Sequence, residues 1–319
     1  MSGRRARSWG ILVLILGVAG GTAVTWRLWR QQQGAESLFR RFPADNLLLI
    51  YLDVGGLRRA GSLAPLLRAR VDPDPDYASF VRQTGFDYQR DLDAAAVCYL
   101  ADRVYLLARG RFDPARLRQY ALSQGGSCGG GELEKPCRMP ASRPDRTISF
   151  WLLTGGLLAL ATAPEAEAAL QLGSPPAENA GPIARAAAAP DSRSPLLWMT
   201  AAPASLDLLG ASATSPHLAL LARALSGAER AYLFVSDRSP DLAVSLTATC
   251  RSASQAGEIR QLLQGLNDLA AGLSRLAPGS KPGGAWPQVL ASAVIRHEQG
   301  SVRAHWTVPP PALEALAAP

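Results

Sequence analysis

The residue types that most often carry out catalysis or bind metals are few in this chain and widely spaced. Its 319 residues include three histidines, His217, His297 and His305, and four cysteines. No histidine lies at ligand spacing from another histidine, a cysteine or a carboxylate, whereas a structural zinc site needs four ligands. A serine–histidine–aspartate triad can assemble from distant residues, but no Gly-x-Ser-x-Gly elbow indicates its serine. The sequence therefore predicts no catalytic residue, no cofactor-binding residue and no metal ligand.

Four aspartates could still form a carboxylate cluster suited to acid–base chemistry. They are Asp53, Asp87, Asp91 and Asp93. The alternative, which we favour, is that these side chains cap helices and satisfy turns near Arg58 and Arg90.

A second acidic run, residues 72–76, has the Asp-x-Asp-x-Asp alternation of a calcium-binding loop. An EF-hand loop also needs glycine at its sixth position and glutamate at its twelfth, where this chain has Tyr77 and Gln83. We therefore expect a proline-stiffened turn, with Asp76 as the N-cap of a following helix.

Cys128 and Cys137 flank a glycine-rich loop and are close enough in sequence to form a local disulfide. Closing a loop of about ten residues would stabilise the fold by about 2.7 kcal/mol through chain entropy. A disulfide needs an oxidising compartment, which favours export. A metal site is the alternative, although two cysteines without a nearby histidine provide too few ligands. Cys98 and Cys250 are expected to be buried apolar residues, with a disulfide between them left open.

Residues 9–26 carry no charge and are flanked by Trp9 and Trp26. At 1.5 Å per residue this segment would span about 27 Å, close to the thickness of a bilayer's hydrocarbon core. We interpret residues 1–30 as an uncleaved signal anchor that contacts the cytoplasmic membrane through residues 9–28. A cleaved signal peptide is the alternative, but no convincing cleavage site follows the apolar stretch.

The charge distribution gives an orientation and excludes one class of partner. Three arginines precede the apolar segment and two follow it, which favours an exported remainder by a narrow margin. The net charge is +7, from 33 basic and 26 acidic residues. Because five of the basic residues lie in or beside the anchor, the exported part is only about +2 and shows no basic cluster. We therefore expect no nucleic-acid partner.

Beyond the anchor, the order of predicted elements occurs twice. A polar tether covers residues 31–42, a first α+β unit covers 43–173, a Pro/Ala/Ser-rich linker covers 174–195, and a second α+β unit covers 196–319. Each unit has the order strand, helix, strand, strand, helix, strand, strand, helix. The expected strands are 47–52, 95–100, 104–109, 148–153 and 157–162, then 196–200, 231–235, 242–250, 289–296 and 301–308. The fold class expected is α+β, as two tandem copies with mainly antiparallel sheets after a transmembrane helix.

Several short motifs lie in the first unit: 42–45 with Tyr51 and Asp53, then 84–88, 91–93 and 109–113. With the anchor and the hairpins, they resemble membrane-anchored bacterial envelope proteins of a domain-of-unknown-function type. The resemblance covers most of the chain, and it implies structural roles for these motifs without implying an activity.

The expected function is that of a non-catalytic scaffold or binding module, held by its N-terminal helix at the outer face of a bacterial cytoplasmic membrane. Its expected partner, besides the membrane, is another envelope protein or a lipid. Two alternatives stay open: an extracytoplasmic hydrolase with a scattered active site, and a carrier of an apolar or lipid ligand. A deep cleft with convergent polar groups would favour the hydrolase, and an enclosed apolar cavity would favour the carrier.

Overall fold

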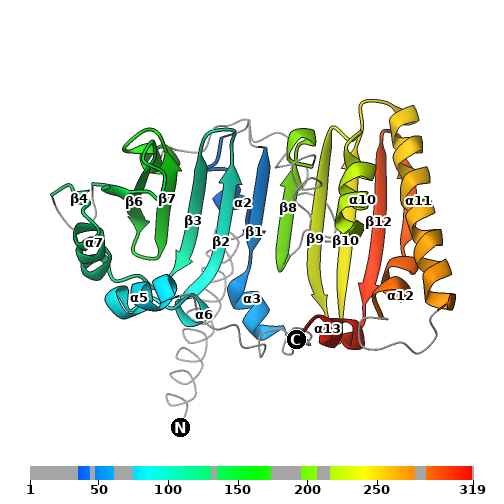
Figure 1. The fold of residues 1–319 in the computed structure, drawn as a ribbon, viewed down its shortest axis with the longest axis horizontal. Coiled ribbons are helices and arrows are strands. Elements are labelled where there is room, and N and C mark those ends of the chain that lie inside the picture. The colour runs from blue at the N-terminus through cyan, green and yellow to red at the C-terminus, as the bar shows by residue number, and fades with distance from the viewer. Residues whose placement is uncertain are drawn as a thin grey trace, which may run out of the picture.

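The computed structural model describes residues 35–43, 47–60, 75–130, 135–173, 195–206, 216–276 and 285–317. Its central feature is a single 12-stranded sheet in which every pair of neighbouring strands is antiparallel (Figure 1). The strands lie in the order β11-β12-β10-β9-β8-β1-β2-β3-β7-β6-β5-β4.

The first seven strands along the chain are β1 (Leu48–Leu52), β2 (Leu92–Tyr99), β3 (Val104–Gly110), β4 (Ser127–Cys128), β5 (Cys137–Pro140), β6 (Thr147–Thr154) and β7 (Leu157–Ala163). The remaining strands are β8 (Leu197–Ala201), β9 (Arg230–Arg238), β10 (Asp241–Thr249), β11 (Val294–Glu298) and β12 (Ser301–Val308). The helices are α2 (Ala35–Phe39), α3 (Val54–Arg59), α5 (Pro75–Thr84), α6 (Tyr88–Asp91), α7 (Pro114–Ser123), α10 (Pro216–Leu225), α11 (Ala253–Leu276), α12 (Ala285–Ala291) and α13 (Pro310–Ala317), with the 3-10 helix η2 at Ala168–Gly173.

The prediction of two tandem α+β units, each with its own sheet, is wrong, because β1 and β8 join the strands into one sheet. They pair antiparallel along their whole lengths, from Leu48 opposite Ala201 to Leu52 opposite Leu197. An unpaired edge would expose a row of backbone N–H and C=O groups on both strands, and this pairing satisfies them. The side chains make the joint apolar as well, since Trp198 lies opposite Tyr51 and is 1% exposed.

The expected tether, residues 31–42, is also corrected for its described part. Residues 35–39 form α2, and the side chains of Leu38 and Phe39 are buried in the core. The Phe39 ring packs edge-on against Trp198, with 4.3 Å between centroids. A short helix therefore covers the sheet close to the β1–β8 joint, where sequence polarity indicated a solvated linker.

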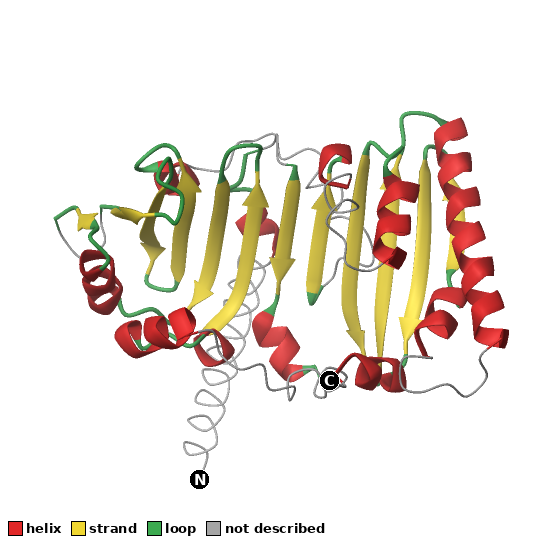
Figure 2. Ribbon diagram, in the orientation of Figure 1, coloured by secondary structure: helices red, strands yellow, loops and turns green. Residues whose placement is uncertain are grey.

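The helices cover the two faces of the sheet unevenly. Figure 2 shows α10 and α11 on the near face of the right half, and α2 lies behind β1 and β2. On α11, Ile259 and Leu263 are buried against the sheet. Leu262 and Leu269 of the same helix are 54% and 53% exposed, because the sheet covers only one side of the helix.

Local signals placed several elements correctly. Asp113 caps α7 by accepting a hydrogen bond from the Arg116 amide, and Pro114 takes the first helical position. Two expectations fail: Asp76 lies inside the first turn of α5 and does not cap it, and the strand expected at 289–296 begins only at Val294, after α12.

Within the described residues, no helix combines the length and the apolar character that a membrane crossing requires. The predicted anchor, residues 9–28, lies outside the described residues, as do the linker at 174–194 and most of the acidic run at 72–76.

Candidate functional site

The predicted carboxylates do not assemble into one acid–base cluster. Asp53 caps α3, accepting a hydrogen bond from the Gly56 amide at 2.6 Å, and Asp87 caps α6, accepting one from the Gln89 amide at 2.9 Å. The capping roles expected from the sequence are therefore confirmed for both residues. Asp93 pairs with Arg58 at 3.1 Å.

Asp91 is the most enclosed of these carboxylates and is held by two guanidinium groups. Arg90 donates to it through Nη2 at 2.8 Å, Arg111 lies 3.1 Å away, and the Asp87 amide donates at 3.0 Å. The hydrogen bonds from Arg90, with the charge of Arg111, lower the pKa of Asp91 to about 2. The group is therefore ionised and paired at neutral pH, which suits a structural clamp and not proton transfer.

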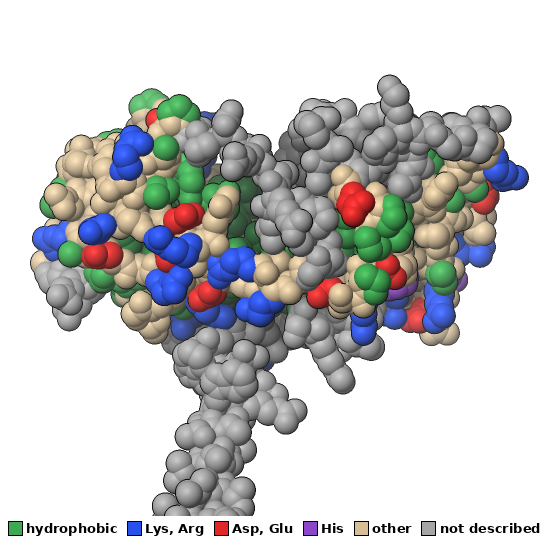
Figure 3. Space-filling model, turned by 90° about the horizontal axis from the view of Figure 1, so that it is seen from below, with side chains coloured by type: hydrophobic (Ala, Val, Ile, Leu, Met, Phe, Trp, Pro, Cys, Tyr) green, Lys and Arg blue, Asp and Glu red, His purple; other side chains and the backbone are tan. Residues whose placement is uncertain are grey.

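The sequence motifs at 84–88, 91–93 and 109–113 meet around this clamp at the lower edge of the sheet. They line a hollow of about 280 Å³ in which Phe86 stacks on Phe112 with 4.9 Å between ring centroids. Seen from below in Figure 3, basic and acidic side chains intermingle across this half of the molecule. Gly110 is required here, because a Cβ atom would lie 2.3 Å from the Asp91 carbonyl oxygen. These motifs therefore hold α5, α6 and α7 to the ends of β2 and β3.

The two histidines whose side chains are described, His297 and His305, do not form a shared site. His297 lies on the exposed strand β11, and the side chain of His217 is outside the described residues. Nδ1 of His305, on β12, lies 3.0 Å from the hydroxyl of Ser245 on β10, a contact that only the cross-strand register could reveal. Ser245 lies in the middle of β10, between two paired strands. Its surrounding amides are therefore committed to the sheet and cannot form an oxyanion hole.

Among the described residues, no group of three or more histidine, cysteine, aspartate or glutamate side chains could hold a metal ion.

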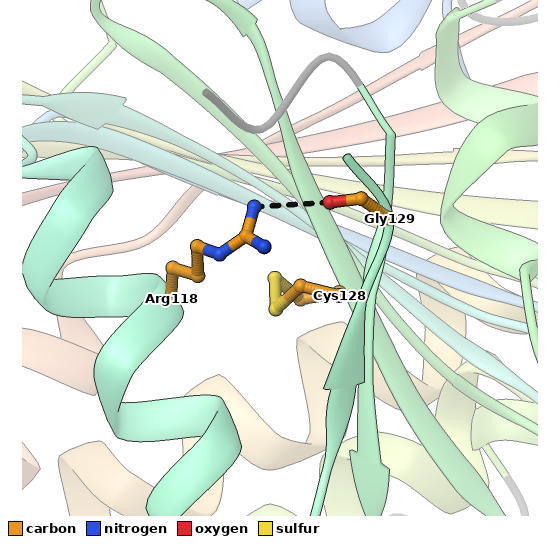
Figure 4. The surroundings of a disulfide bond; sticks show 4 residues. Arg118, Cys128 and Gly129 are labelled. Carbon is orange, nitrogen blue, oxygen red and sulfur yellow. Dashed lines mark hydrogen bonds between the residues drawn. A yellow bond between two sulfur atoms is a disulfide. The ribbon is translucent and has the colours of Figure 1, made fainter. Parts of the chain in front are cut away.

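The predicted disulfide between Cys128 and Cys137 is present. It joins β4 to β5 at one end of the sheet, and Arg118 of α7 donates to the neighbouring Gly129 carbonyl at 3.0 Å (Figure 4). The disulfide and the hydrogen bond from Arg118 therefore hold β4, the terminal strand of the sheet, in place.

No disulfide joins the two remaining cysteines, both of which are described. Cys98 is buried in β2, as the sequence predicted. Burial raises the pKa of the Cys250 thiol, and the nearby charge of Glu229 raises it further. Neither observation indicates a reactive thiolate.

Two hollows lie on either side of the β2–β3 turn, residues 100–103. The first, which we call the Arg146 hollow, has a volume of about 470 Å³. It is lined by Leu100, Ala101, Asp102, Arg103, Val104, Ala141, Ser142, Arg143, Arg146, Ile148 and Thr162. The second has a volume of about 400 Å³ and shares Leu100, Ala101, Asp102 and Arg103 with the first. Both volumes lie in the range typical of small-molecule sites.

Ion pairs stabilise the turn between the two hollows. Arg103 donates to both carboxylate oxygens of Asp102 at 2.8 Å and lies 3.2 Å from Glu165. These hydrogen bonds lower the pKa of Asp102 and raise the pKa of Arg103. In the second hollow, the Tyr105 hydroxyl donates to the Gln171 side chain at 2.5 Å. The shared wall is therefore fixed before any ligand arrives.

Arg146 differs from Arg103 because its hydrogen bonding is incomplete. Nη1 of Arg146 donates to the Asp102 carbonyl oxygen, while its Nε atom is buried and has no hydrogen-bond partner within the described part of the chain. A buried donor without a partner is costly, and a charged one more so. Sequence reasoning missed this residue because nothing local indicates that the loop at 141–146 faces a turn about 40 residues earlier.

No family model and no curated protein matches this chain. Among solved structures, it is similar to a protein named TP0453 in three crystal forms. Form III has 11% sequence identity and a TM-score of 0.48, over 88% of this chain and 97% of that one. Form IV has 11% identity and a TM-score of 0.47, over 87% and 95%. Form I has 8% identity and a TM-score of 0.42, over 88% and 96%.

Proposed function

We propose that this protein is a non-catalytic binding module, tethered to the outer face of a bacterial cytoplasmic membrane, and that it binds its ligand at the two hollows beside the β2–β3 turn. The observation that carries the proposal is the Arg146 hollow itself. It combines about 470 Å³ of space, a turn fixed by ion pairs and a guanidinium with an unsatisfied donor. Concave sites with a few well-placed polar groups are the usual form of a binding pocket.

The chemistry of the lining supports binding over hydrolysis. Of the described residues that line the Arg146 hollow, Ser142 and Thr162 carry hydroxyl groups and none is a histidine. The carboxylate of Asp102 is committed to Arg103 through two hydrogen bonds. A hydroxyl nucleophile needs a nearby base to activate it, and these residues offer none.

Two observations support the proposed location. The uncharged segment at residues 9–26 follows three arginines, and the disulfide between Cys128 and Cys137 belongs in an oxidising compartment.

The proposal is tested by affinity capture of the full chain from its native membrane, with the bound proteins and lipids identified. Ala101 lies in the turn, lines both hollows and is exposed, so Ala101→Trp would obstruct both. Ala115→Trp is the matched control, since Ala115 is exposed on α7 away from these hollows. We expect Ala101→Trp to lose material that wild type and Ala115→Trp both retain. Identical captured sets from folded samples of all three proteins would contradict the proposal.

A further inference from the structure

We propose that the Arg146 hollow takes the oxyanion head of a small amphiphile, a carboxylate or a phosphate, with the apolar body of the ligand lying against the hollow's aliphatic wall. This inference rests on the binding function proposed above and specifies its ligand.

Positive charge predominates among the residues that line the Arg146 hollow, where Arg103, Arg143 and Arg146 accompany one carboxylate, Asp102. A guanidinium has five N–H donors, and within the described residues that of Arg146 makes one hydrogen bond, to the neutral carbonyl oxygen of Asp102. No aspartate or glutamate of the described chain forms an ion pair with Arg146. An oxyanion on the open side of the half-buried Arg146 side chain would balance this positive charge, because guanidinium groups pair with carboxylate and phosphate through two parallel hydrogen bonds.

Other arginines in the same half of the molecule differ from Arg146 because they form ion pairs with carboxylates. Arg103 lines the same hollow, but Asp102 and Glu165 already balance its charge. At the lower edge, Arg90 and Arg111 are both committed to Asp91. Among these four arginines, Arg146 is the one without a carboxylate ion pair in the described part of the chain.

Arg143 adds positive charge at the rim of the same hollow. It is exposed, and its carbonyl oxygen accepts a hydrogen bond from the Arg146 amide at 3.1 Å, which keeps the two arginines on one turn. Arg143 therefore adds an exposed positive charge beside the half-buried Arg146.

The wall of the hollow beside these charges is apolar. Leu100, Val104 and Ile148 line the hollow and are half-buried, so each still presents apolar surface to solvent. A bare inorganic ion would leave that surface wet, whereas a hydrocarbon body would cover it at a gain of roughly 25 cal/mol per Å². The lining therefore fits a ligand with an anionic end and an apolar end.

The test uses the full chain in nanodiscs of zwitterionic lipid, with empty nanodiscs as the blank, and measures binding by calorimetry. Four probes separate the contributions: decanoate, decyl phosphate, uncharged decanol and inorganic phosphate. We expect at least one of the two amphiphilic anions to bind one to one, with decanol and inorganic phosphate each at least tenfold weaker. The stronger of the two anions identifies the headgroup.

Substitutions at Arg146 test whether this side chain binds the anionic head of the ligand. Arg146→Gln should weaken binding of the anion by 10- to 100-fold, as the loss of charge-assisted hydrogen bonds predicts. Arg146→Lys keeps the charge without the planar fork and should restore part of the affinity. Arg238→Gln removes the same charge from the exposed end of β9 and should change affinity less than twofold. Thermal unfolding establishes that each variant is folded, and the lysine variant serves if the glutamine variant is not.

Three results would overturn the inference. Inorganic phosphate that binds as tightly as decyl phosphate would exclude the apolar body, and decanol that binds as tightly as decanoate would exclude the anionic head. If no probe binds while Ala101→Trp still abolishes capture from membranes, the ligand class is wrong and the binding function stands. If Ala101→Trp also leaves capture unchanged, both proposals fail.

Discussion

Replacing Asp91 by asparagine isolates the clamp that joins α6 to the end of β3. The substitution keeps the size of the side chain but removes the charge that faces Arg90 and Arg111. The pKa of Asp91 falls from 3.8 to about 2, mainly through the hydrogen bonds from Arg90. At about 1.4 kcal/mol per pH unit, such a shift corresponds to at most roughly 2.5 kcal/mol of folding free energy.

The measured loss of folding free energy should be smaller than this upper limit, because solvent screens the charges of Arg90 and Arg111. The side chain of Asp91 is 9% exposed, but those of Arg90 and Arg111 are 66% and 71% exposed. We therefore expect Asp91→Asn to lower the free energy of unfolding by about 1 kcal/mol at pH 7. Asp93→Asn is the matched control: its carboxylate is 61% exposed and pairs with Arg58, so its loss should stay below about 0.5 kcal/mol.

The pH dependence gives an independent check. Because the folded pKa of Asp91 is depressed, its contribution is present above about pH 4 and is lost as the pH falls towards 2. Urea unfolding of the full chain at pH 7 and pH 3 should therefore show a difference between wild type and Asp91→Asn that shrinks at the lower pH. An Asp91→Asn loss no larger than that of Asp93→Asn at pH 7 would refute the clamp.

Three further predictions concern other parts of the chain. Mass mapping of non-reduced, alkylated protein should find Cys128 linked to Cys137, and a variant with alanine at both positions should lose up to about 2.7 kcal/mol of stability; free thiols at both would contradict the export argument. Burial raises the pKa of Tyr51 to about 12, so ultraviolet titration should show a late-ionising component that is smaller by one tyrosine in Tyr51→Phe, and stability should fall as the pH rises above 10. A phosphatase fused after Pro319 should be active and a cytoplasmic reporter silent; the reverse would exclude the proposed topology.

The parts of the fold that the sequence predicted are those with local signals. Asp113 followed by Pro114 is a local signal for the start of α7, and the strands expected at 148–153 and 157–162 correspond to β6 and β7. The disulfide followed from the short spacing of two cysteines. In each case the residues that interact lie within about ten positions of one another in the sequence. Local residue types are therefore sufficient to predict the element.

What the sequence did not predict depends on contacts between distant segments. The pairing of β1 with β8 joins residues about 150 positions apart, and the alternation within each strand says nothing about the strand beside it. α2 looked like part of a linker because Phe39 finds its partner, Trp198, only in the folded sheet. Arg146 likewise became a candidate only when the turn at 100–103 was placed beside it.

The central claim is that the hollows beside the β2–β3 turn bind a ligand in the cell. The most direct measurement replaces Ala101 with a photo-crosslinking amino acid in the full chain, irradiates living cells and analyses adducts by mass spectrometry. The same amino acid at Ala115 is the control. A discrete adduct at position 101 that is absent at position 115, and that Arg146→Gln diminishes, is the result the binding function predicts. Equal amounts of folded protein at the membrane with no adduct at position 101 would contradict it.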